Sequence, residues 1–182
     1  MDNTNKKIRF ATVWMDGCSG CHMSFLDMDE KILELAEHLE VVCSPYVDVK
    51  EYPEGVDLVI IEGAISSVED EEKAKKIRKR STLVMSFGDC AVTGNVTALR
   101  NIPGLEACFE RAYHENATVN NSTPSVDLPK QLEHVRPLNE VIHVDIFLPG
   151  CPPPATSIYA ILKDLIDGNE LDFAAYNTRF GR

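Results

Sequence analysis

Strand-like and helix-like patterns of hydrophobic residues alternate along this chain. The run at 57–61 (DLVII) is apolar almost throughout, as in a strand covered on both faces, and the other strand-like runs are also rich in β-branched and aromatic residues. We predict strands at 8–14, 41–43, 57–61, 82–87 and 144–148. Because crossover segments separate these strands, the pattern favours an α/β fold with a parallel, doubly wound sheet, in a single domain spanning residues 1–182.

Helical spacing of apolar residues fills most of the connections. Ser24 and Asp27 have the spacing of a capping box, which would start a helix just after Cys21. Helices are predicted at 24–39, 68–80, 104–114 and 155–166. In the helix at 68–80, acidic residues fill the first turn and basic residues the last turns, which suits the helix macrodipole. The basic run is therefore interpreted as a solvated helix end.

One stretch shows neither pattern. Residues 115–135 are rich in Asn, Ser, Thr and Pro, and we predict an irregular excursion over the surface there. Such a segment is either a contact for a partner or disordered, and the sequence leaves both possibilities open.

Four cysteines follow three of the predicted strands. Cys18 and Cys21 come after the first strand, Cys90 after the strand at 82–87, and Cys151 after the last one, each with glycine nearby. The carboxyl ends of parallel strands lie at one edge of a sheet, so we expect these thiols to meet. Four thiolates can ligate an iron-sulfur cluster, and glycine-rich turns let backbone N–H groups approach its sulfurs. The pattern therefore indicates one cluster site.

Two other uses of these cysteines remain open. A Cys-x-x-Cys motif is also typical of thiol-disulfide oxidoreductases, and here Cys18 and Cys21 lie between a strand and a helix, near Trp14. That interpretation leaves Cys90 and Cys151 without a role. Four thiolates could equally bind structural zinc, which would make the chain a zinc-stabilised interaction module.

Two further polar residues lie near this edge. Glu62 ends a buried strand there, which makes it a candidate proton carrier with a raised pKa, or else a hydrogen-bonded carboxylate at a strand end. His22 adjoins Cys21 and either approaches the cluster or is an ordinary polar loop residue. The remaining cysteines, Cys43 and Cys108, are predicted to be small buried hydrophobic residues.

Composition, charge and the first residues of the chain argue against several classes of function. The 182 residues carry a net charge of −11, which disfavours a nucleic-acid partner. Residues 1–14 have neither a long apolar run nor a twin-arginine pair, so we expect neither secretion nor membrane insertion, and the reduced cysteines favour the cytoplasm. The first strand is followed by MDGCSGCH instead of a glycine-rich nucleotide loop, so this chain is not expected to bind a nicotinamide dinucleotide.

Taken together, four motifs resemble one known family. They are CSGC at 18–21, EGAI at 62–65, GDCAVTG at 88–94 and GCPP at 150–153. In combination they resemble the small subunit of NiFe hydrogenases and the related 20 kDa subunit of respiratory complex I, over the chain from Ile8 to about Gly168. The resemblance implies a flavodoxin-like domain whose four motif cysteines bind one proximal 4Fe-4S cluster, the cluster facing a nickel-iron site on a partner large subunit.

Within this family the chain is most similar to the small subunits of the cytoplasmic, bidirectional, NAD(P)-linked hydrogenases, because two residues separate its first two cysteines and neither a leader nor a further cluster motif is seen. The resemblance implies that the large subunit splits hydrogen and that electrons pass to diaphorase subunits carrying flavin and iron-sulfur groups. FMN could also bind the flavodoxin-like sheet. Met23 occupies a position that is Glu in many relatives, which leaves Glu62 as the better proton carrier.

Overall fold

The centre of the molecule is a sheet of five parallel strands, seen in a computed structural model that describes residues 6–49, 51–176 and 178–181. Its strands are β1 (Ile8–Trp14), β2 (Leu39–Cys43), β3 (Val56–Glu62), β5 (Ser81–Phe87) and β7 (Ile146–Leu148), in the order β2-β1-β3-β5-β7. Counted among themselves, these strands have the 2-1-3-4-5 order of flavodoxin-like folds. The predicted fold class is confirmed.

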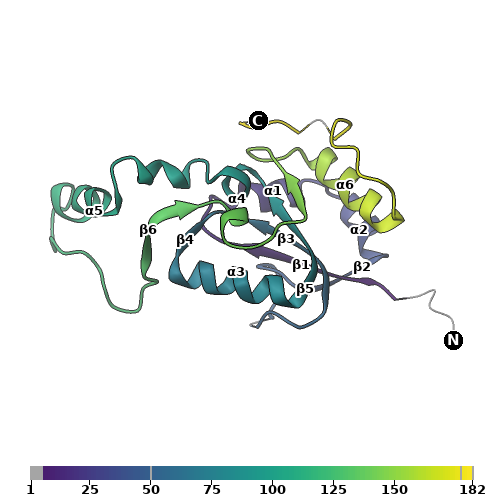
Figure 1. Ribbon diagram of the computed structural model, residues 1–182, viewed down its shortest axis with the longest axis horizontal. Coiled ribbons are helices and arrows are strands. Elements are labelled where there is room, and N and C mark those ends of the chain that lie inside the picture. The colour runs from purple at the N-terminus through teal and green to yellow at the C-terminus, as the bar shows by residue number, and fades with distance from the viewer. Residues whose placement is uncertain (1–5, 50, 177, 182) are drawn as a thin grey trace.

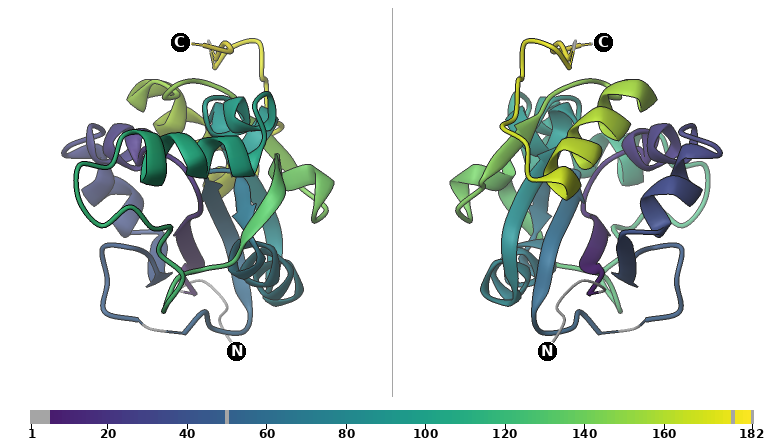
Figure 2. Two further views of the ribbon diagram at one scale, coloured as in Figure 1. Left: turned by 90° about the vertical axis from the view of Figure 1, so that its left-hand side faces the viewer. Right: turned by 90° about the vertical axis from the view of Figure 1, so that its right-hand side faces the viewer.

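Helices cover both faces of the sheet (Figures 1 and 2). Consecutive residues of β3 point to opposite faces. Leu58 and Ile60 pack in the core under α1 (Gly20–Leu26), α2 (Lys31–Ala36) and α6 (Ala155–Asp167). Val59 and Ile61 pack in the other core, under α3 (Val68–Arg80) and the segment that contains the short helix η3 (Leu138–Glu140). This two-sided burial explains the continuous apolar run of β3.

The prediction of one helix over residues 24–39 is wrong, because two short helices form there. α1 begins at Gly20, after Ser19 in a left-handed conformation with φ of 66°. The Ser24 hydroxyl does not cap a helix but donates to the carbonyl of Pro153 at 2.6 Å. Asp29, with φ of 50°, lies between the two helices. Cys21 is therefore inside the first helix and not ahead of it.

A second, two-stranded sheet was not predicted. β4 (Ile65–Ser67) pairs antiparallel with β6 (Gln131–Arg136), so the last residues of the expected irregular excursion at 115–135 form a strand. The Ser67 side chain at the end of β4 accepts a hydrogen bond from Asp70 N–H, and the Asp70 carboxylate accepts from Ser67. This capping box begins α3.

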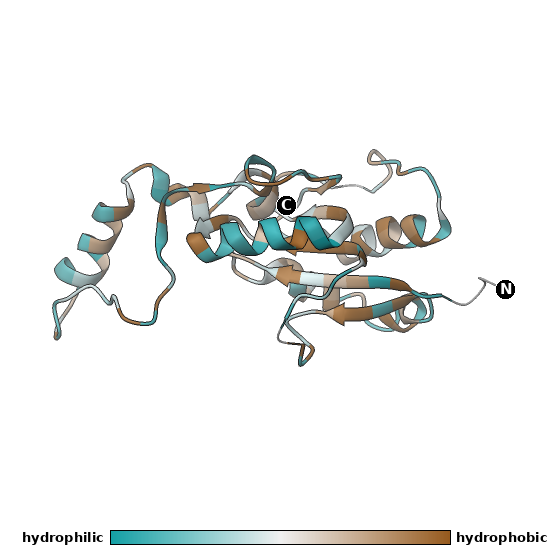
Figure 3. Ribbon diagram, turned by 60° about the horizontal axis from the view of Figure 1, so that its bottom comes forward, coloured by the Kyte–Doolittle hydropathy of each residue, from teal (hydrophilic) through white to brown (hydrophobic). Residues whose placement is uncertain are grey.

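A long segment that precedes β6 in the sequence projects from the body of the molecule as an arm (Figures 1 and 3). We define the arm as residues 95–130, which contain η1 (Thr97–Asn101), α5 (Leu105–Phe109) and the wide π-helical turn η2 (Glu110–Glu115). None of its side chains is buried. Polar contacts hold its base instead, since Arg100 donates to the carbonyls of Ser66 and Leu132 at 2.9 Å each.

No helix among the described residues is long and apolar enough to cross a membrane. The expectation that the chain lacks a leader rests partly on residues 1–5, which lie outside the described residues.

Asp145 ties the edge strand β7 to the rest of the sheet. Its carboxylate accepts from Val84 N–H at 2.7 Å and from the Arg78 guanidinium at 2.5 Å. Partial burial would raise the pKa of Asp145, but the Val84 N–H and Arg78 outweigh it and hold that pKa below its ordinary value. A lowered pKa means that the charged form stabilises the fold above the ordinary pKa of Asp, and that this contribution is lost as the pH falls through the folded-state pKa.

We therefore expect Asp145→Asn to lower the free energy of unfolding by about 1–3 kcal/mol at pH 7, since it removes charged hydrogen bonds. The difference from the wild type should shrink below about pH 4, where the wild-type carboxyl also becomes protonated. Urea unfolding at several pH values measures this, with the exposed Glu133→Gln as the control. A difference that stays the same at all pH values would contradict the assignment.

Candidate functional site

The carboxyl ends of four parallel strands lie in one row. In register, Trp14 pairs with Glu62, Glu62 with Phe87, and Phe87 with Leu148. Cys18 follows β1 by four residues, whereas Cys90 and Cys151 each follow their strands by three. Because the strands end together, these short connections bring the predicted cysteines to one edge of the sheet.

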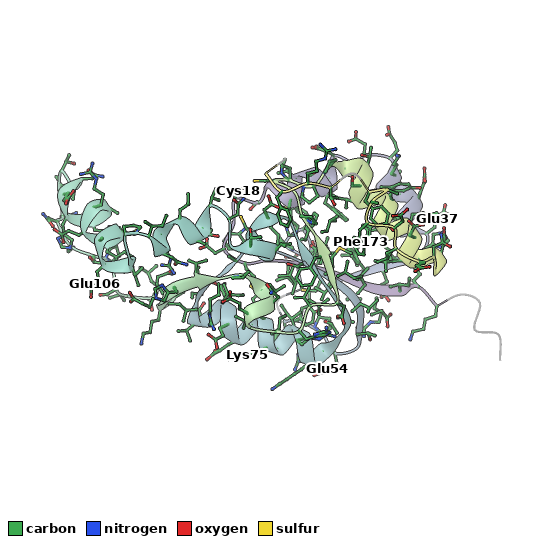
Figure 4. The ribbon with its side chains drawn as sticks, turned by 45° about the horizontal axis from the view of Figure 1, so that its top comes forward. Cys18, Glu37, Glu54, Lys75, Glu106 and Phe173 are labelled. Atoms are coloured by element: carbon green, nitrogen blue, oxygen red, sulfur yellow. The ribbon has the colours of Figure 1, made fainter. Side chains whose placement is uncertain are left out.

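Two of the four thiols are buried and two are exposed. Cys21 and Cys90 are each 7% exposed, whereas Cys18 and Cys151 lie at the surface. Figure 4 shows Cys18 at the upper edge of the molecule. Burial strongly raises the pKa of the Cys21 thiol, and negative charge on Glu62 and on the other three cysteines raises it further. The four sulfurs are thus close enough to act on one another electrostatically.

The first residues of the arm supply hydrogen-bond donors to this group. Burial and the neighbouring thiolates of Cys151 and Cys18 raise the pKa of Cys90, while the nearby Thr97 hydroxyl and the Val96 N–H lower it. The Thr97 hydroxyl itself donates to the carbonyl of Gly94 at 2.6 Å. The Asn95 side-chain amide donates to the Cys151 sulfur at 3.5 Å. Sequence reasoning missed these donors, although they come directly after the Gly88–Gly94 motif.

Gly88 lets the backbone pass close to a thiol. Its φ is +82°, and a Cβ atom built there would lie 2.1 Å from the sulfur of Cys21 and 3.4 Å from the carbonyl oxygen of Gly150. Only glycine combines this φ with this approach. Four converging thiols with a close backbone and N–H donors form a suitable donor set for an iron-sulfur cluster.

Hydrogen bonds join the three loops that carry the cysteines. The Asp89 carboxylate, which is 4% exposed, accepts from Gly150 N–H at 2.7 Å and from Gly181 N–H at 2.6 Å. Asp89 N–H in turn donates to the Gly150 carbonyl at 2.9 Å, and α4 (Asp89–Thr93) begins there. The bond from Ser24 to Pro153 joins α1 to the last loop. Asp89 and Ser24 therefore fix the positions of the cysteine loops relative to one another.

Glu62 is almost fully buried beneath α1. Its carboxylate accepts from Cys21 N–H at 3.4 Å, from His22 N–H at 3.0 Å and from the His22 ring through Nδ1. The His22 ring is packed edge-on against the rings of Tyr46 and Phe87, and its Nε2 has no hydrogen-bond partner among the described residues. Glu62 thus holds the first turn of the helix that carries Cys21.

The other predicted site residues lie apart from this arrangement or have ordinary surroundings. Cys43 and Cys108 were expected to be buried, but both are partly exposed. In the described part of the chain, no group of three or more His, Cys, Asp or Glu side chains has the spacing of a site for a single metal ion. Met23, two residues after Cys21, is 56% exposed on α1.

The chain belongs to the family described as the 20 kDa subunit of NADH ubiquinone oxidoreductase, whose model matches residues 18–165. Its homologues are subunits of hydrogenases. The chain is 37% identical over 183 residues to the delta subunit of the NAD-reducing hydrogenase HoxS of Cupriavidus necator, covering 98% of this chain and 88% of that subunit. A subunit of the F420-non-reducing hydrogenase of Methanothermobacter marburgensis is 39% identical over 94% of this chain, which spans only 58% of that relative.

Solved structures show the same relationship. The crystal structure of an NAD+-reducing [NiFe]-hydrogenase in the H2-reduced state contains a chain that is 36% identical, with a TM-score of 0.91 over 96% of this chain and 99% of that one. The [NiFeSe] hydrogenase of Desulfovibrio vulgaris Hildenborough matches with a TM-score of 0.58 at 15% identity, over 90% of this chain and 61% of that one. The second match supports the fold alone.

The close approach at Gly88 can be tested with a matched pair of substitutions. Gly88 and Gly104 each precede a short helix with nearly the same backbone angles, φ and ψ of 82° and 162° against 89° and 159°. A Cβ atom at Gly104 would meet nothing within 4 Å. We expect Gly88→Ala to displace the Cys21 sulfur and to lower the iron content at least about tenfold, whereas Gly104→Ala carries the same backbone strain and keeps its iron. Metal analysis after anaerobic purification measures both. Equal iron in the two variants would show that Cys21 does not need this position.

Proposed function

We propose that this chain is the electron-transfer small subunit of a soluble, NAD(P)-linked NiFe hydrogenase, with one 4Fe-4S cluster bound by Cys18, Cys21, Cys90 and Cys151. The observation that carries the proposal is the meeting of four thiols from three strand ends with donors from Asn95 and Val96. The identity of 37% to a subunit of an NAD-reducing hydrogenase, over nearly the whole chain, supports the hydrogenase assignment.

The residues around the thiols have separable tasks. When bound, an iron-sulfur cluster supplies a centre that accepts and releases one electron at a time. The buried Cys21 and Cys90 would hold it from the protein side, and the exposed Cys18 and Cys151 would hold it from the side that faces a partner. Donors to the sulfurs, such as Asn95, stabilise negative charge and so tune the reduction potential. Asp89 limits movement of the loops as that charge changes.

The proposed partners are a large subunit with the nickel-iron centre and diaphorase subunits that exchange electrons with NAD(P). The name of the Cupriavidus necator relative supports an NAD-linked acceptor. Hydrogen-derived electrons would enter from the large subunit and leave toward the diaphorase, or flow in reverse. An FMN on this chain, which the flavodoxin-like fold permits, is a separate prediction. It would give flavin fluorescence after denaturation of the purified chain.

Cys90→Ser and Cys151→Ser should remove or convert the cluster and stop hydrogen-dependent NAD(P) reduction, because a serine hydroxyl is a poor substitute for a thiolate ligand. Cys43→Ser and Cys108→Ser are matched controls and should keep both properties. The measurements are iron content and visible absorption of the anaerobically purified protein, with about four irons expected in the wild type.

Two results would contradict the assignment of an iron-sulfur cluster. Colourless wild-type protein with one zinc would favour the zinc-stabilised module, and colourless metal-free protein with a titratable Cys18–Cys21 pair would favour thiol-disulfide exchange. Full activity and full iron in either Cys90→Ser or Cys151→Ser would exclude that residue as a ligand.

For Glu62 we propose that this buried carboxylate transfers protons on a route toward the large subunit, in addition to its contacts with α1. Glu62→Gln keeps the size of the side chain but cannot gain and lose a proton, so hydrogen-dependent turnover should fall by about a hundredfold, a typical general acid-base contribution. Iron content should be unchanged. The exposed Glu40→Gln is the control. Normal turnover in Glu62→Gln would limit the role of Glu62 to positioning the helix that carries Cys21.

A further inference from the structure

The arm has no hydrophobic core of its own. No side chain between residues 95 and 134 is buried, although ordering a backbone costs conformational entropy that burial usually offsets. Large apolar side chains are nevertheless concentrated there, at Val96, Leu99, Ile102, Val119, Val126 and Leu128, with exposed fractions from 52% to 84%. Apolar surface of this extent on one element marks an interaction site.

The arm also carries a groove. An open groove of about 560 Å³ lies between its helical part and the returning loop. Leu105, Phe109 and Tyr113 line one wall, and Pro124, Leu128 and Pro129 line the other. Glu106, near the far end of the arm in Figure 4, and Glu110 are charged and exposed. An apolar centre with a charged rim is the usual composition of a protein interface.

The arm begins at the cysteine edge itself. Asn95 contacts the Cys151 sulfur, and the exposed Val96 and Leu99 follow within four residues. In Figure 4, Cys18 also lies at the edge from which the arm extends. A partner that covers the exposed thiols would therefore continue directly onto Val96, Leu99 and Ile102.

The size of a stable protein interface also indicates that the arm takes part in docking. An interface of ordinary size uses roughly 20–30 residues on each side, and obligate ones use more. The exposed part of the cysteine edge, with Cys18, Met23 and Cys151, supplies only a few. The arm supplies the remainder without distorting the sheet, since polar contacts at Arg100 and Asn101 already fix its base.

We infer that the arm, residues 95–130, is the second half of the docking surface for the nickel-iron large subunit, with Leu99 and Ile102 at its apolar centre and the groove receiving side chains of that subunit. The inference rests on the proposed function, because it takes the large subunit to be the partner at the exposed thiols. The match to the chain from the NAD+-reducing [NiFe]-hydrogenase covers 96% of this chain, so it includes most of the arm.

The test uses the complete enzyme, purified through a tag on the large subunit. Leu99→Asp and Ile102→Asp each place a carboxylate in the proposed apolar centre, where it loses water without gaining a partner. We expect the amount of this chain retained with the large subunit to fall at least about tenfold. Leu33→Asp, at a residue 71% exposed on α2, is the matched control and should be retained as the wild type is. Because Leu99 and Ile102 are 60% and 84% exposed, their replacement should leave the chain folded, which circular dichroism and iron content check.

Hydrogen exchange in the wild-type enzyme is an independent measurement. Amides of the arm should exchange at least about tenfold more slowly in the complete enzyme than in the chain expressed alone. Normal retention of both Asp variants, or fast exchange of the arm in the complete enzyme, would overturn the inference. Protection that survives removal of the large subunit and is lost with the diaphorase subunits would overturn it too.

These results are distinct from failure of the proposed function. If the wild type contains about four irons and loses them in Cys151→Ser, while the arm variants are retained normally, the function stands and the docking assignment is wrong. If the wild type holds no iron, or does not associate with the large subunit at all, the proposed function fails first and the docking assignment fails with it.

Discussion

The parallel register of the central sheet is the constraint on which the site depends. Trp14, Glu62, Phe87 and Leu148 end their strands in one row, so three short connections reach the same place. A slip of one residue in any pairing would turn that strand's buried side chains to the opposite face, which the two hydrophobic cores forbid. The position of the thiols is therefore determined by the packing of the two cores, of which Cys21 itself is a part.

Glu62 illustrates how the core and the site share residues. A carboxylate that is 1% exposed is costly unless hydrogen bonds compensate it, and here two backbone N–H groups and the His22 ring do so. Those N–H groups belong to the first turn of α1, where a helix has donors without internal partners. The same contact that makes the buried charge tolerable therefore orients Cys21.

Much of the sheet could be read from the sequence, and the reason is periodicity. The apolar run of β3 and the charge order of α3 are local patterns, and the four cysteine motifs each follow a strand, so fold class and candidate ligands were accessible. The structure differs from the sequence-based prediction where a residue distant in the sequence determines the local conformation. Ser24 donates a hydrogen bond to Pro153 and so does not cap a helix, and no residue near Ser24 in the sequence predicts this contact. β4 has only three residues, too few for a pattern, and it is a strand because β6 pairs with it. The Asn95 amide and the Val96 N–H reach the sulfurs only after the turn at Gly94 folds the chain back.

The arm and the sheet bury no side chain in common, and this separation has an evolutionary consequence. Substitutions along residues 102–130, beyond the base held by Arg100 and Asn101, leave both cores intact, so their effect on folding should be small. Residues such as Gly88 and Asp89, by contrast, are confined by neighbours on several loops at once. The chain thus divides into a part that tolerates sequence drift and a part that resists it. A lineage could adapt its arm to a new large subunit while the thiol site stayed as it was.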